Sequence, residues 1–225
     1  SELDTTPIDT AAMTKTPITE STIHHHIACS VPALSQPTST PPAGRCQVGK
    51  NPPMAHDRRF RFGAQLHHPF VGMTWAESAR RLEELGYSTL HMPDHFGDQL
   101  APIAAMTAAA AATTSLKVGT LVFDNDYRHP VVLAKEMATI DVLFEGRCEV
   151  GMGAGWMRSD YTSSGITMDR PGTRVDRLME GVAIVQGLWS GERVNHSGEH
   201  YTITDLAGIP VPASPGGPAL ILAGG

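Results

Sequence analysis

The segment Thr89-Leu90-His91-Met92-Pro93-Asp94-His95-Phe96 is the most informative part of this sequence about its architecture. It begins as an apolar strand directly after an amphipathic helical pattern, and it ends with an acid beside a histidine. In parallel α/β sheets, ligands bind and catalytic side chains emerge at the carboxyl ends of the strands. Asp94 and His95 are therefore the first candidates for catalysis. The competing interpretation is a buried histidine beside an aspartate that caps a helix.

Side chains alternate along a strand, which separates this stretch into an apolar and a more polar face. One face carries Leu90, Met92 and Asp94, and the other carries Thr89, His91, Pro93 and His95. We expect the more polar face to line the interior of a barrel.

On both sides of this stretch, strand patterns alternate with helical patterns. The strands are expected at 60–66, from Thr89, at 116–122, at 148–152 and at 218–223. The helices are expected from Trp75 to Leu85, over 102–114, over 133–144 and over 178–189, and a polar insertion at 190–215 contains a hairpin at 194–203.

Strict alternation of strands and helices predicts a parallel sheet with right-handed crossovers. A doubly wound dinucleotide fold needs G-x-G-x-x-G after its first strand. Here the glycine-rich turn follows the fourth strand, as Gly151-Met152-Gly153-Ala154-Gly155, and Trp156 stands where the last glycine belongs. The sequence therefore favours a (β/α)8 barrel, truncated after about five of its eight strands. The expected domain is 58–225.

The composition and net charge of the chain limit the kinds of molecule that it is expected to bind. The chain is 41% hydrophobic and 18% charged, with a formal net charge of -6. This charge gives no reason to bind nucleic acid or an anionic membrane, so a small-molecule substrate is expected. No apolar run is long enough to span a bilayer, and the first residues lack the basic start of a secretory signal. The three cysteines are too scattered for a disulfide framework or a zinc site, which fits the cytoplasm.

Residues 1–57 differ from the rest of the chain. They are rich in Thr, Pro and Ser and have no sustained apolar period. A segment of this composition does not bury enough apolar surface to fold. We expect it to be a disordered or dispensable extension.

Several motifs, taken in order, resemble the luciferase-like monooxygenase superfamily, and within it the oxidoreductases that use coenzyme F420. They are Arg61-Phe62-Gly63, Pro93-Asp94-His95-Phe96, Val118-Gly119-Thr120, Arg128-His129-Pro130 with Ala134-Lys135, Gly146-Arg147, the segment from Gly151 to Trp156, and Pro218 to Gly225. The resemblance implies a (β/α)8 barrel with the cofactor at the carboxyl end of its strands, often as a homodimer.

The resemblance also implies roles for individual residues. His95 matches a histidine that transfers a proton or polarises the substrate, and Asp94 would orient it or bind the edge of the cofactor ring. The expected cofactor-binding residues are Thr120, Leu121, Val122, Gly151, Gly153, Gly155, Trp156, Gly224 and Gly225. At Leu121 and Val122 the family carries a strand bulge with a cis peptide. Where its sugar-phosphate dehydrogenases place an acid, this chain has Trp156, so that substrate class is not carried over.

Other interpretations stay open. Flavin mononucleotide (FMN) is the alternative cofactor, for a luciferase-like monooxygenase, and a truncated, non-catalytic homologue is a further alternative. A metal-dependent hydrolase is disfavoured because adjacent side chains such as His67 and His68 point to opposite faces of a strand. No metal is therefore expected. Arg170 and Arg174 can simply be solvated, and Asp126 with Arg128 can be a surface pair.

Overall fold

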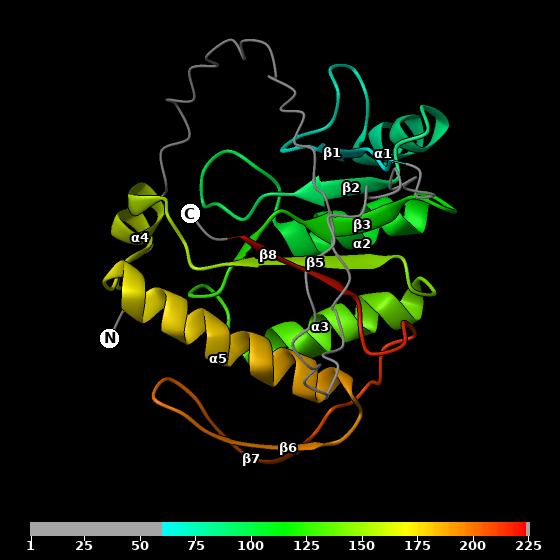
Figure 1. The fold of residues 1–225 in the computed structure, drawn as a ribbon. Helices are drawn as coiled ribbons and strands as arrows, with labels where there is room; N and C mark the ends of the chain where they lie inside the picture. Colours follow the sequence, from blue (N-terminus) through cyan, green and yellow to red (C-terminus); the bar gives the residue numbers. More distant parts are fainter. Residues whose placement is uncertain (1–59, 224–225) are drawn as a thin grey trace, which may run out of the picture.

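The computed structural model describes residues 60–223 and shows an α/β fold in which parallel strands alternate with helices (Figure 1). The predictions for residues 1–57 and for Gly224 and Gly225 lie outside the described residues. The strands of the parallel sheet are β1 (Gly63–Gln65), β2 (Thr89–Met92), β3 (Lys117–Thr120), β4 (Phe123–Asp124), β5 (Cys148–Gly153) and β8 (Ala219–Ala223). The helices are α1 (Trp75–Glu84), α2 (Pro102–Ala112), α3 (Pro130–Leu143), α4 (Arg158–Ser164) and α5 (Pro171–Trp189).

The strands of this sheet follow one another in space in the order in which the chain makes them. β1 pairs with β2, β2 with β3, and β3 and β4 both pair with β5, which pairs in turn with β8, always in parallel. A doubly wound sheet reverses direction at a switch point, whereas a barrel continues one way round. The order therefore supports the barrel type. Within residues 60–223 the sheet does not close, because β1 and β8 each have one neighbour.

Local sequence explains where the helices begin. Thr74 forms a capping box with Glu77, since the Thr74 hydroxyl accepts the Glu77 N–H while the Glu77 carboxylate accepts the Thr74 N–H. Pro102, Pro130 and Pro171 open α2, α3 and α5. Proline suits the first helical position because its fixed φ is already helical and the missing N–H is not needed there.

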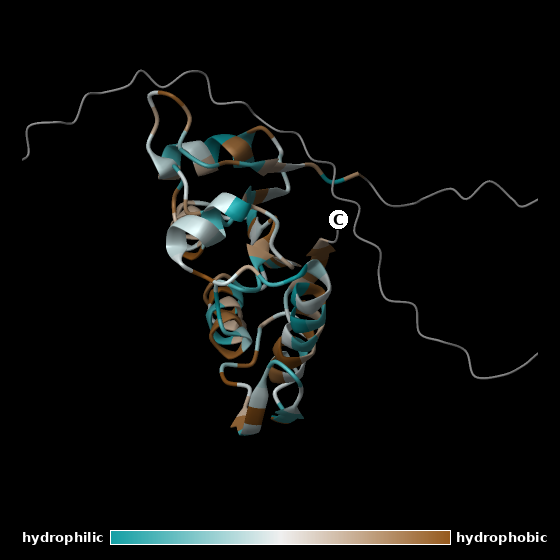
Figure 2. Cartoon of the chain, turned by 90° about the vertical axis from the view of Figure 1, so that its left-hand side faces the viewer, coloured by the Kyte–Doolittle hydropathy of each residue, from teal (hydrophilic) through white to brown (hydrophobic). Residues whose placement is uncertain are grey.

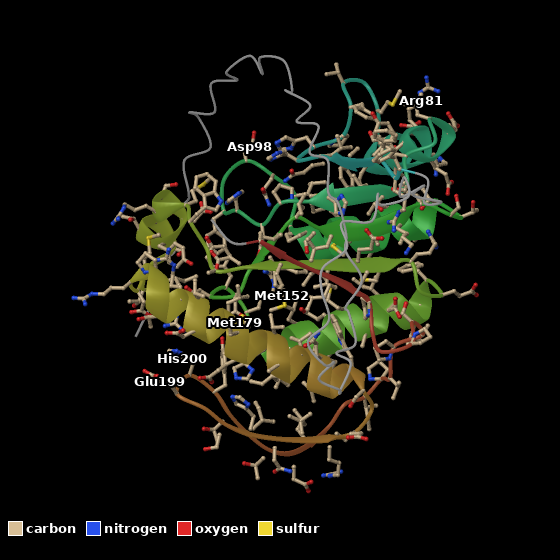
Figure 3. All side chains as sticks on the ribbon, viewed as in Figure 1. Arg81, Asp98, Met152, Met179, Glu199 and His200 are labelled. Carbon is tan, nitrogen blue, oxygen red and sulfur yellow. The ribbon has the colours of Figure 1, made fainter. Side chains whose placement is uncertain are left out.

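The apolar core lies between the helices and one face of the sheet. Met152, labelled in Figure 3, is fully buried on β5, which contacts both α3 and α5. Two tryptophans join neighbouring helices: the Trp75 indole donates to the Ala105 carbonyl at 2.7 Å, and Trp189 donates to the Ala134 carbonyl at 3.0 Å. Figure 2 shows β8 as an apolar, brown strand beside the C label.

The other face of the sheet is polar at the amino end of its strands. The buried carboxylate of Glu149 on β5 forms an ion pair with Arg61, lies 3.4 Å from the Lys117 ammonium and accepts a hydrogen bond from Thr89 at 3.2 Å. Burial alone would raise its pKa, but His91 and the two cations outweigh burial and hold the pKa at about 2. Thr89 and His91 lie here, so the prediction that they share the more polar face is confirmed.

The hairpin formed by β6 (Arg193–Ser197) and β7 (Thr202–Ala207) is a separate antiparallel sheet. Its turn is attached to α5 by the carboxylate of Glu180. This carboxylate accepts backbone N–H groups from Glu199 at 2.9 Å, His200 at 3.2 Å and Tyr201 at 3.1 Å. Glu199 and His200 are labelled in Figure 3. The position confirms the hairpin predicted in the polar insertion.

Three details differ from the sequence-based predictions. The strand expected at 116–122 is shorter in the structure, because β3 ends at Thr120, the cis peptide bond between Leu121 and Val122 follows, and β4 begins only at Phe123. Gly151 and Gly153 belong to β5 and not to a turn, since β8 continues the ladder to the end of that strand. Helix α4 was not predicted, because its residues, Arg-Ser-Asp-Tyr-Thr-Ser-Ser, have no apolar period.

Candidate active site

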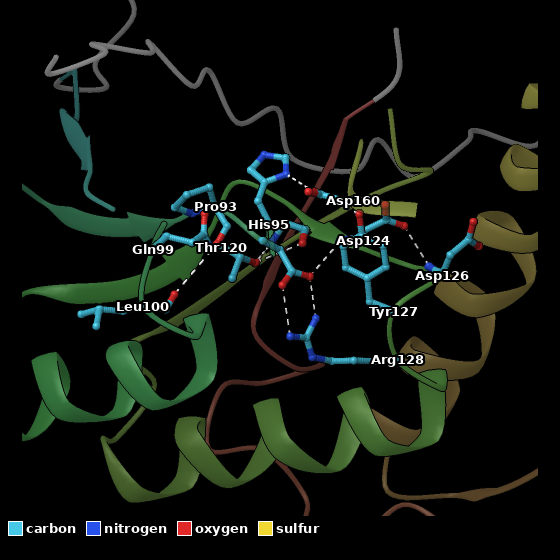
Figure 4. A network of polar contacts seen from close by, with 12 residues as sticks. Pro93, His95, Gln99, Leu100, Thr120, Asp124, Asp126, Tyr127, Arg128 and Asp160 are labelled. Carbon is cyan, nitrogen blue, oxygen red and sulfur yellow. Dashed lines mark hydrogen bonds and ion pairs between the residues drawn. The ribbon is translucent and has the colours of Figure 1, made fainter. Parts of the chain in front are cut away.

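Polar side chains from three segments meet at the carboxyl end of the parallel strands (Figure 4). The segments follow β2, β4 and β5, and they lie together because parallel strands bring their carboxyl ends to one edge of the sheet. This is the edge where the sequence predicted chemistry.

His95 is held by an aspartate that the sequence did not indicate. Its Nδ1 lies 2.7 Å from Oδ2 of Asp160, near the start of α4 (Figure 4). The Asp160 side chain is 6% exposed and that of His95 is 23% exposed, so this contact is shielded while part of the imidazole stays open. The Tyr127 hydroxyl donates to the same Asp160 oxygen at 3.3 Å.

Asp94 does not orient His95, so this part of the prediction is wrong. Its carboxylate makes a two-bond contact with the Arg128 guanidinium, at 2.5 and 3.1 Å, and also accepts the Asp124 N–H at 3.1 Å. The two oxygens of a carboxylate match the fork of a guanidinium, so Arg128 fixes the orientation of the Asp94 side chain. Asp94 therefore joins the segments after β2 and β4. Its suggested contact with a cofactor ring stays a prediction.

Behind this pair lies a buried cluster of carboxylates and a phenol. The Tyr161 hydroxyl lies 2.8 Å from Oδ2 of Asp124 and 3.0 Å from Oδ2 of Asp126. Burial raises the pKa of Asp124, whereas Asp126 forms an ion pair with Arg177 at 2.8 Å. Asp126 and Arg128 are therefore not the surface pair considered from sequence, since each is bound to a different partner.

The bulge after β3 has the geometry that the resemblance implied. The peptide bond from Leu121 to Val122 is cis, and Gln65 on β1 donates to the Leu121 carbonyl at 3.3 Å. Thr120 is fully buried, and its hydroxyl bonds both the carbonyl and the N–H of Gly151, at 3.1 and 3.2 Å. The predicted contact between Thr120 and a cofactor stays a prediction, because no part of this residue is exposed here.

The glycines near this edge are required by the packing of the protein itself. A Cβ on Gly151 would lie 2.4 Å from the Thr120 carbonyl oxygen, and one on Gly153 would lie 2.7 Å from the Val122 side chain. Gly155 has a positive φ of 75°, and a Cβ there would lie 1.9 Å from the Tyr161 hydroxyl. These glycines therefore have a structural role, and their contact with a cofactor stays a prediction.

Trp156 follows these glycines and is an exposed residue beside His95 at the carboxyl edge of the sheet. It is 71% exposed, and its ring meets that of His95 edge to face with centroids 5.8 Å apart. Arg174 on α5 is not solvated, because it is buried and donates to the Ala154 carbonyl at 2.9 Å and to the Gly155 carbonyl at 3.2 Å. Arg174 thus fixes the loop that presents Trp156.

The sequence placed His95 and Trp156 at this edge but did not show their partners. Asp160 lies 65 positions after His95 in the chain, and Tyr127 lies 32 positions after it. These separations are too long for any spacing rule to connect either residue with the imidazole. An acid and a tyrosine at strand ends that share one edge are the only signal that sequence offers.

Neither a cluster of metal ligands nor a membrane-spanning helix is found in the described part of the chain. Among residues 60–223, no group of three or more His, Cys, Asp or Glu side chains is placed to hold a metal ion. Over the same residues, no helix is both long enough and apolar enough to cross a membrane.

Comparison with known proteins gives a family and two kinds of relative. Residues 60–225 match the model of the luciferase-like monooxygenase family. The F420-dependent glucose-6-phosphate dehydrogenase of Amycolatopsis mediterranei (strain U-32) is 32% identical over 157 residues, which cover 66% of this chain and 47% of that protein. The chain thus spans about half the length of the curated relatives it matches.

Solved structures show the same fold. An F420-dependent secondary alcohol dehydrogenase in complex with an F420-acetone adduct superposes with a TM-score of 0.63 at 25% identity, covering 72% of this chain and 51% of that one. The oxygenating constituent of 3,6-diketocamphane monooxygenase from Pseudomonas putida, in complex with FMN, has a TM-score of 0.53 at 21% identity, covering 66% of this chain and 44% of that one. The second likeness shows the fold alone.

Proposed function

Since the chain belongs to the luciferase-like monooxygenase family, we propose that it forms part of an F420-dependent oxidoreductase that passes a hydride between F420 and a small organic substrate. The observation that carries the proposal is His95, partly exposed at the carboxyl edge of the sheet, with Nδ1 on a buried carboxylate. F420-dependent relatives of the chain support the choice of cofactor.

The side chains at this edge suit such chemistry. F420, when bound, would supply or accept the hydride, while the protein supplies binding and orientation. Oxidising an alcohol or reducing a ketone also moves a proton at the substrate oxygen, and a histidine is suited to that transfer near neutral pH. The exposed indole of Trp156 offers a flat apolar surface beside the imidazole. His95 would hold the proton, and Trp156 would help to exclude water.

The substrate proposed here is a small organic molecule, and the sugar-phosphate class of the relatives is not carried over to this chain. The acid that the family's sugar-phosphate dehydrogenases place after the glycines is replaced by Trp156. An indole does not accept hydrogen bonds from sugar hydroxyls, because its N–H is only a donor. The homodimer and the cytoplasmic location remain predictions of the same proposal.

Parallel titrations test the cofactor. Intact protein is titrated with F420 and, separately, with FMN, and the fluorescence of each cofactor is followed. We expect F420 to bind more tightly, and its absorbance to change when a secondary alcohol or ketone is added. Tight FMN binding without detectable F420 binding would show that the protein belongs with the FMN-dependent members and would leave the fold unaffected.

A further inference from the structure

We propose that Asp160, held in place by Tyr127, is the positioning residue that fixes His95 with its hydrogen on Nδ1 and leaves Nε2 to exchange a proton with the substrate. The use of Nε2 rests on the proposed function. The position of the hydrogen does not, and it can be measured without any cofactor.

His95 and Asp160 are in direct hydrogen-bonding contact. Nδ1 of His95 and Oδ2 of Asp160 are 2.7 Å apart, and the carboxylate is 6% exposed. An ionised carboxylate only accepts hydrogen bonds, so the hydrogen between these atoms belongs to Nδ1. In a neutral imidazole the other nitrogen, Nε2, then carries the free lone pair. The ring can therefore take a proton at Nε2 in a defined orientation.

Asp160 is itself restrained by a second hydrogen bond. The Tyr127 hydroxyl donates to the same carboxylate oxygen at 3.3 Å, and burial raises the pKa of Tyr127, so it remains a donor. The Tyr127 ring contacts two other rings, with centroids 4.5 Å from Phe96 and 5.6 Å from Tyr161. These contacts help to hold Tyr127 in place, and its hydroxyl favours the orientation of Asp160 that faces His95.

The other acids near His95 are bound to different partners. Asp94 is occupied by Arg128 and by the Asp124 N–H. Asp124 and Asp126 lie against the Tyr161 hydroxyl. Asp160 is thus the carboxylate in this network that bonds the imidazole.

A purely structural role is the alternative to test against. Asp160 on α4 and His95 after β2 are 65 positions apart in the chain, so their bond also ties two segments of the fold together. Such a tie would matter for stability but would not depend on which nitrogen carries the hydrogen. The hydrogen position therefore separates the two roles.

The decisive measurement is nitrogen NMR of intact protein labelled with ¹⁵N-histidine. The His95 signals are assigned by their loss in the variant His95→Gln. In the wild-type protein at a pH where His95 is neutral, we expect the hydrogen on Nδ1. In Asp160→Asn this preference should disappear, because an amide offers a donor as well as an acceptor, and in Asp160→Glu it should be at least partly restored. Asp176→Asn, which makes the same charge change at an exposed site of α5, is the matched control.

Steady-state kinetics of the same variants test the consequence. We expect Asp160→Asn to lower kcat by about 10²-fold, and by no more than His95→Ala does, while the KM for F420 changes little. A hydrogen on Nε2 in the wild type, or on Nδ1 unchanged in Asp160→Asn, would overturn the proposal. If the NMR result is as expected but no variant, including the wild type, turns over with F420, the positioning role stands and the proposed function fails.

Discussion

His95 is the residue on which the proposed reaction depends most directly. Replacing it with alanine removes the proton-transfer group but leaves the many other contacts that hold a cofactor. We expect kcat to fall ~10²–10⁴-fold with little change in the affinity for F420. Stopped-flow measurement of hydride transfer, together with fluorescence titration of F420, checks both parts.

The matched control is His200→Ala, because His200 lies in the turn of the separate β6–β7 hairpin and not at the carboxyl edge of the parallel sheet. This substitution should change neither kcat nor F420 affinity. An unchanged kcat in His95→Ala would show that His95 has a structural role only.

At the scale of single residues, the sequence predicted the histidine but not its partner. Asp94 adjoins His95 in the chain, yet it pairs with Arg128 from the segment after β4. Neighbours in an extended segment diverge, so adjacency in sequence is weak grounds for contact. Asp160 meets His95 only once α4 has packed against the strand ends, which no local pattern shows.

Strand β5 offers a test at the scale of one element. A Cβ on Gly151 would lie 2.4 Å from the Thr120 carbonyl oxygen, so alanine must push β5 away from the segment after β3. We expect Gly151→Ala to lower the free energy of unfolding by about 1–3 kcal/mol, as overpacking does in well-packed interiors. Urea unfolding followed by circular dichroism measures this loss.

Gly172→Ala is the control for that substitution. Gly172 lies in the first turn of α5 with no atom within 4 Å of the added Cβ, and alanine restricts the unfolded chain. Its midpoint should stay the same or rise slightly. If Gly151→Ala unfolds at the wild-type midpoint, the strand can shift freely and the structural reason for this glycine is wrong.

The elements themselves could be predicted where their period was long enough. Helices α1, α3 and α5 carry apolar stripes, and the strands end at glycine, proline or polar residues. The interruption between β3 and β4 came from the resemblance, because alternation alone continued through Val122. Helix α4 has only seven residues and no apolar stripe, so its polar sequence matched a loop equally well.

The polar cluster around Glu149 joins β2, β3 and β5 with the segment before β1. It makes the stability of the folded protein depend on pH in the acid range. The pKa of Glu149 in the folded protein is about 2, against an ordinary value of 4.5. A lowered folded pKa means that this stabilisation is complete above about pH 4.5 and is lost as the pH falls through about 2. Protonation then leaves Arg61 and Lys117 without their counter-ion.

The variant Glu149→Gln isolates this contribution, because Glu83 and Glu180 also have pKa values of about 2 and act over the same range. We expect the variant to melt below the wild type at neutral pH, and the difference to shrink between about pH 4.5 and 2. Glu84→Gln, at a surface pair with Arg81, should show no such convergence. Scanning calorimetry across this range would refute the assignment if the difference stayed constant.

For the molecule as a whole, the sequence predicted the strand order better than the contacts between strands. Alternation of elements sufficed for a parallel sheet, and the misplaced glycine pattern argued against a doubly wound fold. The cluster around Glu149 could not be predicted in this way. Its members come from four separate segments, and only the register of the sheet brings Arg61, Thr89 and Lys117 to one carboxylate.

The hairpin of β6 and β7 can change in length during evolution more easily than the strands of the parallel sheet can. Its strands pair with each other and not with the parallel sheet, and Glu180 attaches its turn to α5. Residues can be gained or lost within such an appendage without shifting the register of any sheet strand. Descendants of one ancestor can therefore differ in the length of this hairpin while the strands that position His95 keep their register.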